Sequence, residues 1–358
     1  MLKDKRPRFP LKAPFTGLLH LALTAIVVGA CVTHFFGEQG EIHLRADKAE
    51  TIEIKNSKLK IQNCRLTLFQ WGFQVVEDPQ THAPVDYITE LRLLDRSRQP
   101  LTVDEGTLRM NKPLKYHGYR FCQSDYDSDE QGVVLAYNYD PWGTGITYAG
   151  YALLLIAMIA FFFQPKTRFR AMLNQSVFRQ RSGLYSVSAA VLIIILAIIM
   201  TKVVTPKPPL EPVLQTPLLG IHVSVIMLAY TLFAIIAING IVGLCSKKLS
   251  AACYQLSVVL LYPARFCLTA GIFIGAVWAN MSWGRYWGWD PKETWALITM
   301  LVYAMLLHFP WLKKLSAING QRSETVYHVC SIVAFAFVLF TYFGVNHLLG
   351  GLHSYANM

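Results

Sequence analysis

Four tryptophans lie within 13 residues, in the segment Trp283-Gly-Arg-Tyr-Trp-Gly-Trp-Asp-Pro-Lys-Glu-Thr-Trp295, and they are half of the chain's 8 tryptophans. Tryptophan is a large, flat side chain, and several of them in one short connection can present π faces to a planar ligand. Arg285 and Lys292 lie in the same segment and are candidate partners for the carboxylates of such a ligand. The alternative is an interfacial aromatic belt with solvated cations, although a belt spreads its rings over many helix ends.

The same segment carries the signal for the start of a helix. Asp290 is predicted to be the N-cap, Pro291 occupies the first helical position, and Glu293 completes a capping box. Asp290 is therefore expected to cap the helix rather than to act as a general acid. The sequence predicts an aromatic platform that is fixed to the end of a membrane helix.

This string resembles the tryptophan-rich WWD signature of the proteins that handle haem in cytochrome c maturation. It is most similar to the CcsA (ResC) subunit of the system II cytochrome c synthase, whose pattern is W-G-x-x-W-x-W-D-P-K-E-x-W. Residues 110–126 resemble the CcsB (ResB) pattern N-x-P-L-x-Y-x-G-Y-x-F-x-Q-S-x-Y. Residues 1–165 thus resemble a reduced CcsB half and residues 183–358 a CcsA half. Larger CcsB proteins have more spans and a bigger outer domain, so the need for a further subunit stays open.

The resemblance implies haem export across the membrane and a lyase-type activity that attaches haem through thioether bonds to C-x-x-C-H motifs of apocytochrome c. Haem b is then the transported ligand. The implied partners are apocytochrome c, haem, a thiol-reducing thioredoxin-like protein and membrane lipid. No catalytic side chain is assigned, because the protein contributes orientation and redox protection. The alternatives are a CcmC-like haem chaperone or transporter without synthase activity and a b-type electron-transfer membrane subunit; the fused CcsB-like half favours the synthase.

Four of the 10 histidines are the implied axial ligands of haem iron. The resemblance assigns the outer pair to His222 and to His353, which lies in the string GLHSY, and His347 is the rival for the second position. His20 and His308 form an inner pair at matched depth near the cytoplasmic ends of their spans. The alternative for a lone histidine at a helix end is an interfacial side chain, although a histidine inside a span is more often functional. The predicted haem-binding residues are His222, His353, His20, His308, Trp283, Trp287, Trp289, Trp295, Tyr286 and Arg285.

Other candidate residues have simpler interpretations. Cys64 and Cys122 lie in the same outer segment and could form a disulfide in an oxidising compartment, but the sequence leaves their pairing open. The other cysteines lie in or beside apolar runs, where cysteine behaves as a small hydrophobic residue. The remaining histidines are expected at interfaces or on the surface: His34, His43, His82, His117, His328 and, unless it is a ligand, His347.

The elements that must position these residues follow from composition. The chain has 358 residues, of which 53% are hydrophobic and 15% charged, and this is typical of a polytopic membrane protein. The net charge of +11 is concentrated in short segments, which marks them as cytoplasmic and argues against nucleic acid as a partner. The N-terminus is thus expected inside a bacterial-type inner (cytoplasmic) membrane, with the Trp loop 283–295 and the C-terminus outside. The apolar runs long enough to span a bilayer are 15–36, 144–163, 184–203, 220–244, 262–280, 295–311 and 325–345.

Residues 37–142 are the only sizeable soluble unit and are predicted to lie outside. The segments 51–54, 65–69, 87–93 and 133–137 alternate in polarity or are rich in β-branched residues, with turn residues between them. The expected fold is a polytopic α-helical membrane protein with about seven transmembrane helices and an extracytoplasmic mainly-β domain.

Overall fold

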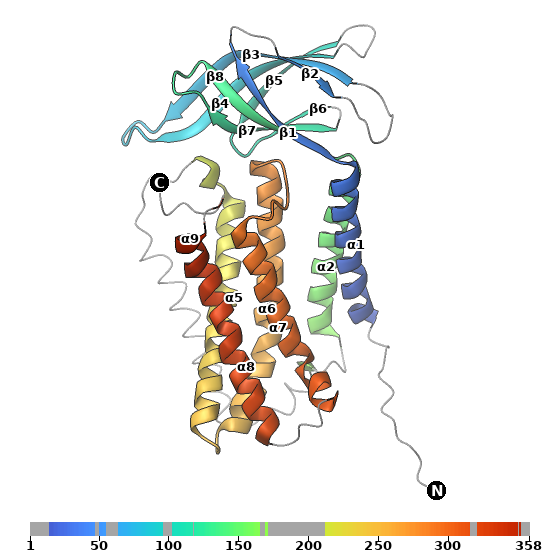
Figure 1. Cartoon of the computed structure of the whole chain (residues 1–358), viewed down its shortest axis with the longest axis vertical. Helices are drawn as coiled ribbons and strands as arrows, with labels where there is room; N and C mark the ends of the chain where they lie inside the picture. Colours follow the sequence, from blue (N-terminus) through green and yellow to red (C-terminus); the bar gives the residue numbers. More distant parts are fainter. Residues whose placement is uncertain are drawn as a thin grey trace.

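The computed structural model describes residues 14–46, 50–54, 64–95, 102–116, 118–164, 169–170, 212–315, 321–349 and 351. In it a β-domain lies across one end of a set of long helices (Figure 1). The predicted span 184–203, His117 and His353 lie outside the described residues.

Long apolar helices form the membrane part, as the composition predicts. Within the described residues, five stretches are long and apolar enough to cross a membrane, and α7 runs alongside them. The trace from α8 continues through one π-helical turn, η3, into α9. The helix bounds are α1 Pro14–Phe36, α2 Gly143–Phe163, η2 Pro212–Leu214, α5 Pro217–Cys245, α6 Ser250–Ser282, α7 Pro291–Leu315, α8 Gln321–Leu339, η3 Phe340–Gly344 and α9 Val345–Leu348.

Helix α6 begins much earlier than the sequence suggested. The predicted span 262–280 is part of a helix of 33 residues that starts at Ser250 and contains Pro263 in its interior. Membrane helices tolerate such a proline because neighbouring helices and local adjustments satisfy the freed backbone groups. At 1.5 Å per residue the helix is about 50 Å long, so it extends beyond the hydrocarbon core.

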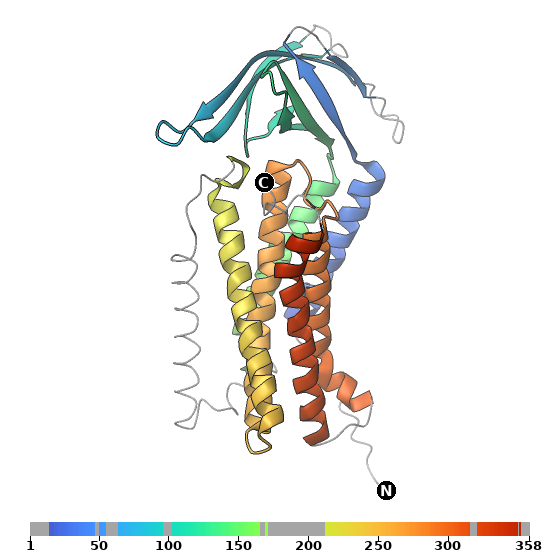
Figure 2. The ribbon, with the colours of Figure 1, turned by 60° about the vertical axis from the view of Figure 1, so that its left-hand side comes forward.

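The β-domain consists of two four-stranded antiparallel sheets, with strand orders β1-β8-β7-β6 and β2-β3-β4-β5 (Figure 2). Both sheets contribute to one buried apolar cluster, for example Leu44 and Phe121 from the first and Leu68 and Leu91 from the second. The four predicted strands correspond to β2, β3, β4 and β8. The bounds are β1 Glu38–Arg45, β2 Glu50–Ile54, β3 Cys64–Glu77, β4 Pro84–Asp95, β5 Thr102–Arg109, β6 Leu114–Tyr116, β7 Tyr119–Tyr126 and β8 Gly132–Tyr139.

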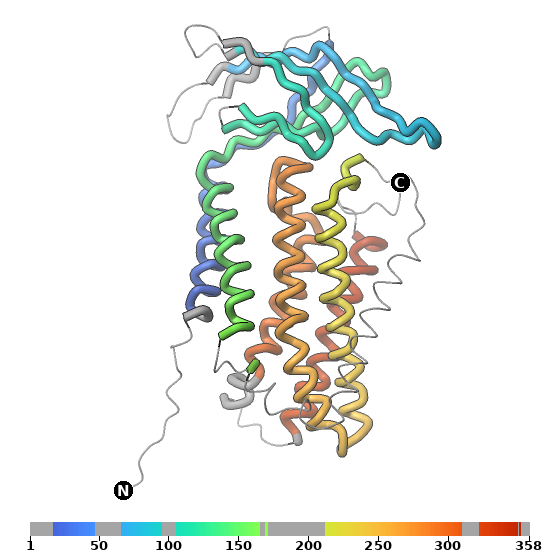
Figure 3. The backbone as a smooth tube through the Cα atoms, turned by 180° about the vertical axis from the view of Figure 1, so that it is seen from behind, coloured from blue at the N-terminus to red at the C-terminus, as the bar shows by residue number. Residues whose placement is uncertain are grey.

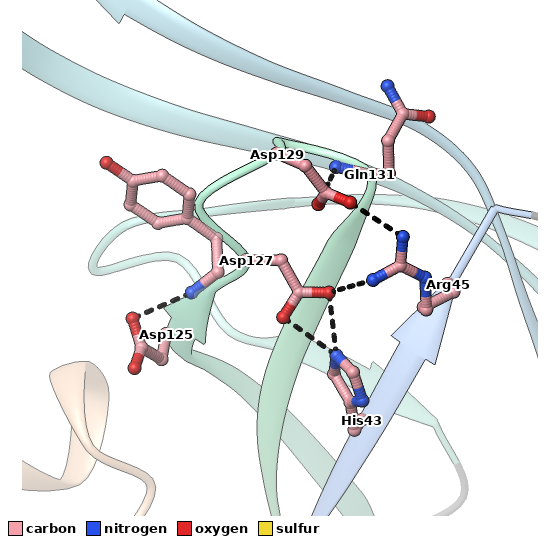
Figure 4. A network of polar contacts seen from close by, with 7 residues as sticks. His43, Arg45, Asp125, Asp127, Asp129 and Gln131 are labelled. Carbon is pink, nitrogen blue, oxygen red and sulfur yellow. Dashed lines mark hydrogen bonds and ion pairs between the residues drawn. The ribbon is translucent and has the colours of Figure 1, made fainter.

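An ion-pair network fixes the turn between β7 and β8 to strand β1 (Figure 4). Arg45 donates to Asp127 Oδ2 and to Asp129 Oδ2, each at 2.7 Å, and His43 Nε2 lies 2.9 Å from Asp127 Oδ1. The hydrogen bond from Arg45 holds the pKa of Asp129 below its usual value. Asp127 and Asp129 are thus neutralised by Arg45, and we interpret this turn as a structural part of the β-domain.

Small residues bring α1 and α2 into close contact. Gly29 lies against Thr147, and Gly150 lies against Ile26. Close approach of backbones at small residues is the usual packing of membrane helices. Helix α2 in turn packs on α6 through aromatic rings: Phe161 stacks on Tyr262 at 5.7 Å, Phe162 meets Phe266 at 5.5 Å, and Tyr151 meets Phe273 at 4.6 Å. Figure 3 shows the α1–α2 pair beside α6.

Replacing Gly29 by isoleucine is expected to separate α1 from α2. A Cβ at Gly29 would lie 2.3 Å from Thr147 Oγ1 and 2.7 Å from the Thr147 backbone nitrogen, so a backbone must move. Overpacking of this kind costs about 1–3 kcal/mol, and the thermal transition of the detergent-solubilised protein should fall accordingly. Gly17→Ile is the matched control, because nothing lies within 4 Å of a Cβ there. Equal transitions for the two variants would contradict the packing.

Candidate functional site

The Trp loop 283–295 connects α6 to α7 and is held by the predicted capping box. The backbone N–H of Lys292 donates to Asp290 Oδ1 at 3.0 Å. Glu293 Oε2 accepts from the backbone N–H groups of Gly288, at 2.8 Å, and Asp290, at 3.3 Å. The predicted capping box of Asp290 and Glu293 is therefore confirmed. The Glu293 carboxylate accepts from two backbone N–H groups and so fixes the loop at Gly288 and at Asp290.

The tryptophan rings form edge-on pairs rather than one flat surface. Trp287 meets Trp289 at 5.9 Å and 89°, and Trp283 meets Trp278 of α6 at 4.8 Å and 70°. Trp289 is 72% exposed, with a left-handed φ of 56° that is costly for a bulky residue. Trp295 packs against α8–η3 aromatic side chains. The buried Trp278 was not predicted, and its Nε1 has no hydrogen-bond partner among the described residues.

Tyr286 anchors the Trp loop to the α1–α2 pair. Its ring is buried, and its hydroxyl lies 2.5 Å from Thr33 Oγ1 on α1 and accepts from Thr147 Oγ1 on α2 at 3.4 Å. Since Thr33 donates to Asp140 Oδ2 at 2.7 Å, Tyr286 is the donor to Thr33. Asp140 also accepts from the Gly143 backbone N–H at the start of α2. The described contacts of Tyr286 are thus those of a structural link.

The two cations of the loop have different surroundings. Lys292 Nζ donates to Asn346 Oδ1 of α9 at 2.7 Å, so it ties the start of α7 to the end of the last span. The Arg285 guanidinium lies over Gly288 and forms no hydrogen bond or ion pair with a described residue. Arg285 is therefore the loop cation that is available for a ligand carboxylate.

His222 lies near the start of α5 and is positioned by α6. Its Nδ1 lies 2.8 Å from the carbonyl oxygen of Gly271. A carbonyl can only accept, so Nδ1 carries the proton and the lone pair resides on Nε2, which is the tautomer that a metal-binding histidine needs. The ring lies on Gly275, where a Cβ would be 2.5 Å from Cε1. Gly275 lies 7 residues before Ser282, about two turns below the loop.

The Gly275→Ala substitution is expected to displace the His222 ring and to weaken the binding of any ligand that the ring holds. Changes to the residues that orient a metal-binding histidine typically cost about 10–100-fold in affinity. Haem content after solubilisation, read from the Soret band, measures this effect. Gly145→Ala serves as control, because a Cβ there meets nothing within 4 Å. Unchanged haem content in Gly275→Ala would show that the ring is not held in this way by α6.

After α9 the chain returns to the Trp loop. His347 is exposed on α9. Gly351 is packed against Asp290, since a Cβ at Gly351 would lie 2.2 Å from Asp290 Oδ2. The chain thus reaches the Trp loop two residues before His353, which is itself outside the described residues. Both candidates for the second outer ligand are retained.

The two histidines of the predicted inner pair lie at similar distances along their own helices, measured from the ends nearer the β-domain, and make no described contact with each other. His20 lies 16 residues before the end of α1 and His308 lies 17 residues after the start of α7, which corresponds to about 24 and 26 Å of helix. Both side chains are exposed on their helices. His308 Nδ1 donates to the carbonyl of Ala304 at 2.8 Å, which leaves the lone pair on Nε2. His20 lies on the side of α1 that faces away from α2.

His328 departs from the expectation of a surface residue. It is fully buried, its Nε2 lies 3.2 Å from the Ser250 carbonyl, and the Ser250 hydroxyl donates to Glu324 at 2.9 Å. Its Nδ1 has no partner among the described residues. The signal was its position inside the apolar run 325–345, where a polar residue usually faces the bundle interior.

The β-domain is hydrogen-bonded to the outer end of α6. Arg120 of β7 donates to the Asn280 carbonyl at 3.2 Å, and Asn280 Nδ2 donates to Tyr148 of α2 at 2.5 Å. Ser282, next to the loop, donates to Asn111 Oδ1 at 2.5 Å. The residues 110–126, which the sequence singled out, therefore include the contacts between the domain and the helices.

Cys122 lies at the same junction. It carries a free thiol, so it does not form the disulfide with Cys64 that the sequence left open. It is buried, and a Cβ at Gly284 of the Trp loop would lie 3.2 Å from its Sγ. Burial raises the pKa of the Cys122 thiol to about 11. The thiol is therefore protonated at neutral pH and packs as an apolar group.

These features define a class: a polytopic membrane protein whose outer β-domain is bonded to a tryptophan-rich loop, with a tautomer-fixed histidine two turns below. Residues 146–353 match the family model of the cytochrome C assembly protein, and residues 16–149 match that of the ResB-like family. The chain therefore belongs to the cytochrome c assembly family, in the fused CcsB/CcsA form of the system II cytochrome c synthases.

Curated relatives agree with the family models. Protein NrfI of Wolinella succinogenes is 37% identical over 190 residues, which cover 49% of this chain and 20% of NrfI. Cytochrome c biogenesis protein CcsA of Chlamydomonas reinhardtii is 39% identical over 162 residues, which cover 41% of this chain and 43% of that protein. CcsA of Arabidopsis thaliana is 46% identical over 90 residues, or 25% of each chain. The matched stretches cover less than half of each of these relatives.

Proposed function

We propose that the chain exports haem across a bacterial-type cytoplasmic membrane and attaches it to apocytochrome c at the outer face. The observation that carries the proposal is His222: its Nδ1 is fixed by Gly271, its Nε2 has the lone pair that iron requires, and the Trp loop lies two turns above. The family assignment supports the same ligand, since it concerns cytochrome c biogenesis. In this proposal the N-terminus is inside and the β-domain is outside.

Each residue of the outer site has a role in this proposal. His222 and His353, with His347 as the alternative, hold haem iron from two sides. The tryptophan rings border the macrocycle, with Trp289 on the exposed side, and Arg285 pairs with a propionate. The protein supplies orientation, while haem b is the cargo whose vinyl groups react.

The covalent step needs no nucleophile of the protein. Each thiol of the apocytochrome C-x-x-C-H segment adds across one haem vinyl group: the sulfur bonds to one vinyl carbon and the proton goes to the other. Bonds and electrons balance without an external oxidant, provided that both thiols arrive reduced, which is the task of a thioredoxin-like partner. The apocytochrome histidine then replaces one outer ligand. The β-domain, bonded to α6 next to the loop, is suited to dock the apocytochrome.

Haem is proposed to arrive through the inner pair. His20 lies in the half of α1 and His308 in the half of α7 that is farther from the β-domain, on the side of the membrane that the basic segments mark as cytoplasmic. Haem bound there would pass outward to the Trp loop. A CcmC-like chaperone without synthase activity is the second candidate, because the loop and the outer histidine serve binding alone equally well.

Co-expression with an apocytochrome in a host that lacks its own maturation system separates the two candidates. A synthase yields apocytochrome that retains haem through denaturing electrophoresis, whereas a chaperone yields haem-loaded membranes without covalent product. His82→Ala is the matched control for the His222→Ala variant in this assay, because this exposed histidine lies in the β3–β4 turn, outside the junction between the β-domain and the helices. Absence of any Soret absorbance in the purified protein from haem-replete cells would refute both candidates.

A further inference from the structure

One charged residue lies in the middle of a membrane-spanning helix. Arg265 is the only charged residue of α6, 15 residues after Ser250 and 17 before Ser282. A charge at this depth is costly, and such residues usually serve a function and have a partner. Arg265 is half-buried and forms no hydrogen bond or ion pair with any residue that the structure describes.

The sequence supplies no acidic partner inside the membrane either. The seven apolar runs that span or can span the bilayer contain neither Asp nor Glu, and this holds for 184–203 as well. An isolated buried guanidinium cannot escape its charge by losing a proton at neutral pH. Its counter-charge is therefore an anion that is not part of the spans.

Arg265 and His308 lie on neighbouring helices. Helices α6 and α7 are antiparallel and pack on each other, and α7 begins farther from the β-domain than α6 ends (Figures 1 and 2). Arg265 is 17 residues before the end of α6, and His308 is 17 residues after the start of α7. On α6, Arg265 follows Tyr262, which contacts α2, by one helical turn. The guanidinium is thus on a helix that α2 and α7 both contact.

Haem carries both groups that such a pair would bind. Its iron takes an imidazole, and its propionates pair with guanidinium in bidentate fashion, within apolar surroundings that suit the ring. We propose that Arg265 holds a propionate of haem at the inner site while His308 holds the iron. This assignment rests on the proposed inner site, and it gives the charge of Arg265 a partner only while cargo is present.

Haem and its dimethyl ester, in which both propionates are blocked, test the assignment. Both compounds are titrated into protein that carries His222→Ala, and binding is followed by visible absorption. The outer site is disabled in this variant, so the absorption change measures binding at the inner site. Haem should bind about tenfold more tightly than the ester, as one charge-assisted hydrogen bond allows. Arg265→Gln should abolish this preference without weakening ester binding, and Arg265→Lys should keep part of it. Arg322→Gln removes an exposed cation of α8 and should change nothing.

The outcomes distinguish two failures. If the His222→Ala protein binds neither compound, the inner site itself is absent, and the export step of the proposed function fails with it. If it binds both and Arg265→Gln keeps the tenfold preference for haem, the inner site stands and Arg265 is not its anion-binding residue. Equal affinity for haem and ester in the parent protein would also overturn the assignment and indicate a lipid phosphate as the counter-charge. Size-exclusion profiles of the Gln and Lys variants exclude misfolding as the cause.

Discussion

Replacement of His222 by alanine is expected to abolish covalent haem attachment, with a drop in holocytochrome of roughly 100-fold, the scale on which misplaced reactants lose rate. In the proposed site this imidazole is the iron ligand, and its Nδ1 lies 2.8 Å from the Gly271 carbonyl oxygen, so its loss should leave haem unoriented beside the Trp loop. Imidazole added to the growth medium should restore part of the product by filling the empty coordination position. Haem staining of denatured apocytochrome measures both effects.

Two further variants decide the second outer ligand. His353→Ala should behave as His222→Ala does, including the rescue, while His347→Ala should retain activity. The reverse result would move the role to His347, which is exposed on α9. Rescue of neither His222→Ala nor His353→Ala, with wild-type haem content in both, would contradict iron ligation from these positions.

Loss of His308 should starve the outer site, while damage to the Trp loop should not. His308→Ala is expected to lower bound haem and holocytochrome together, because haem export is proposed to begin at the inner pair. Trp289→Ala is expected to lose product but keep haem, which stays at the inner pair. Trp289 is 72% exposed, so its removal should leave the packing intact. Haem per protein in membranes at matched expression distinguishes the two classes.

His34→Ala is a suitable control for the inner-pair variants. It also removes an exposed histidine from a membrane helix, but at the outer end of α1. Wild-type haem and product in His308→Ala would show that no inner site exists at this position. Equal haem loss in His308→Ala and Trp289→Ala would contradict the direction of transfer.

Local signals in the sequence were sufficient for the loop and the helices. The Asp290–Glu293 capping box is a short-range pattern, and it forms as predicted. The apolar runs locate the helices because bilayer thickness fixes their length. The start of α6 was predicted too late, at residue 262, because the tolerance of Pro263 inside a membrane helix depends on the neighbouring helices. Short or polar strands such as β6 and β5 were missed because pairing across a sheet, rather than local pattern, stabilises them.

Contacts between distant segments could not be predicted. Tyr286 was expected on the haem platform, but its described partners Thr33 and Thr147 lie more than a hundred residues away in sequence. The edge-on packing of Trp283 depends on Trp278, a residue of another element. By charge alone Arg265 belongs with Lys247 and Lys248 to a basic cytoplasmic segment, whereas the structure places it inside helix α6.

The way in which the two halves meet bears on how such a protein can be encoded. Stacked rings of α2 and α6, the Tyr286 hydroxyl and the Arg120–Asn280 contact join them, and all are side-chain interactions distant from the connecting segment. Covalent continuity adds local concentration but none of these contacts. Two genes that supply residues 1–170 and 171–358 should therefore yield a complex that co-purifies. A single reading frame is then a means of enforcing equal dosage and timely pairing in the membrane.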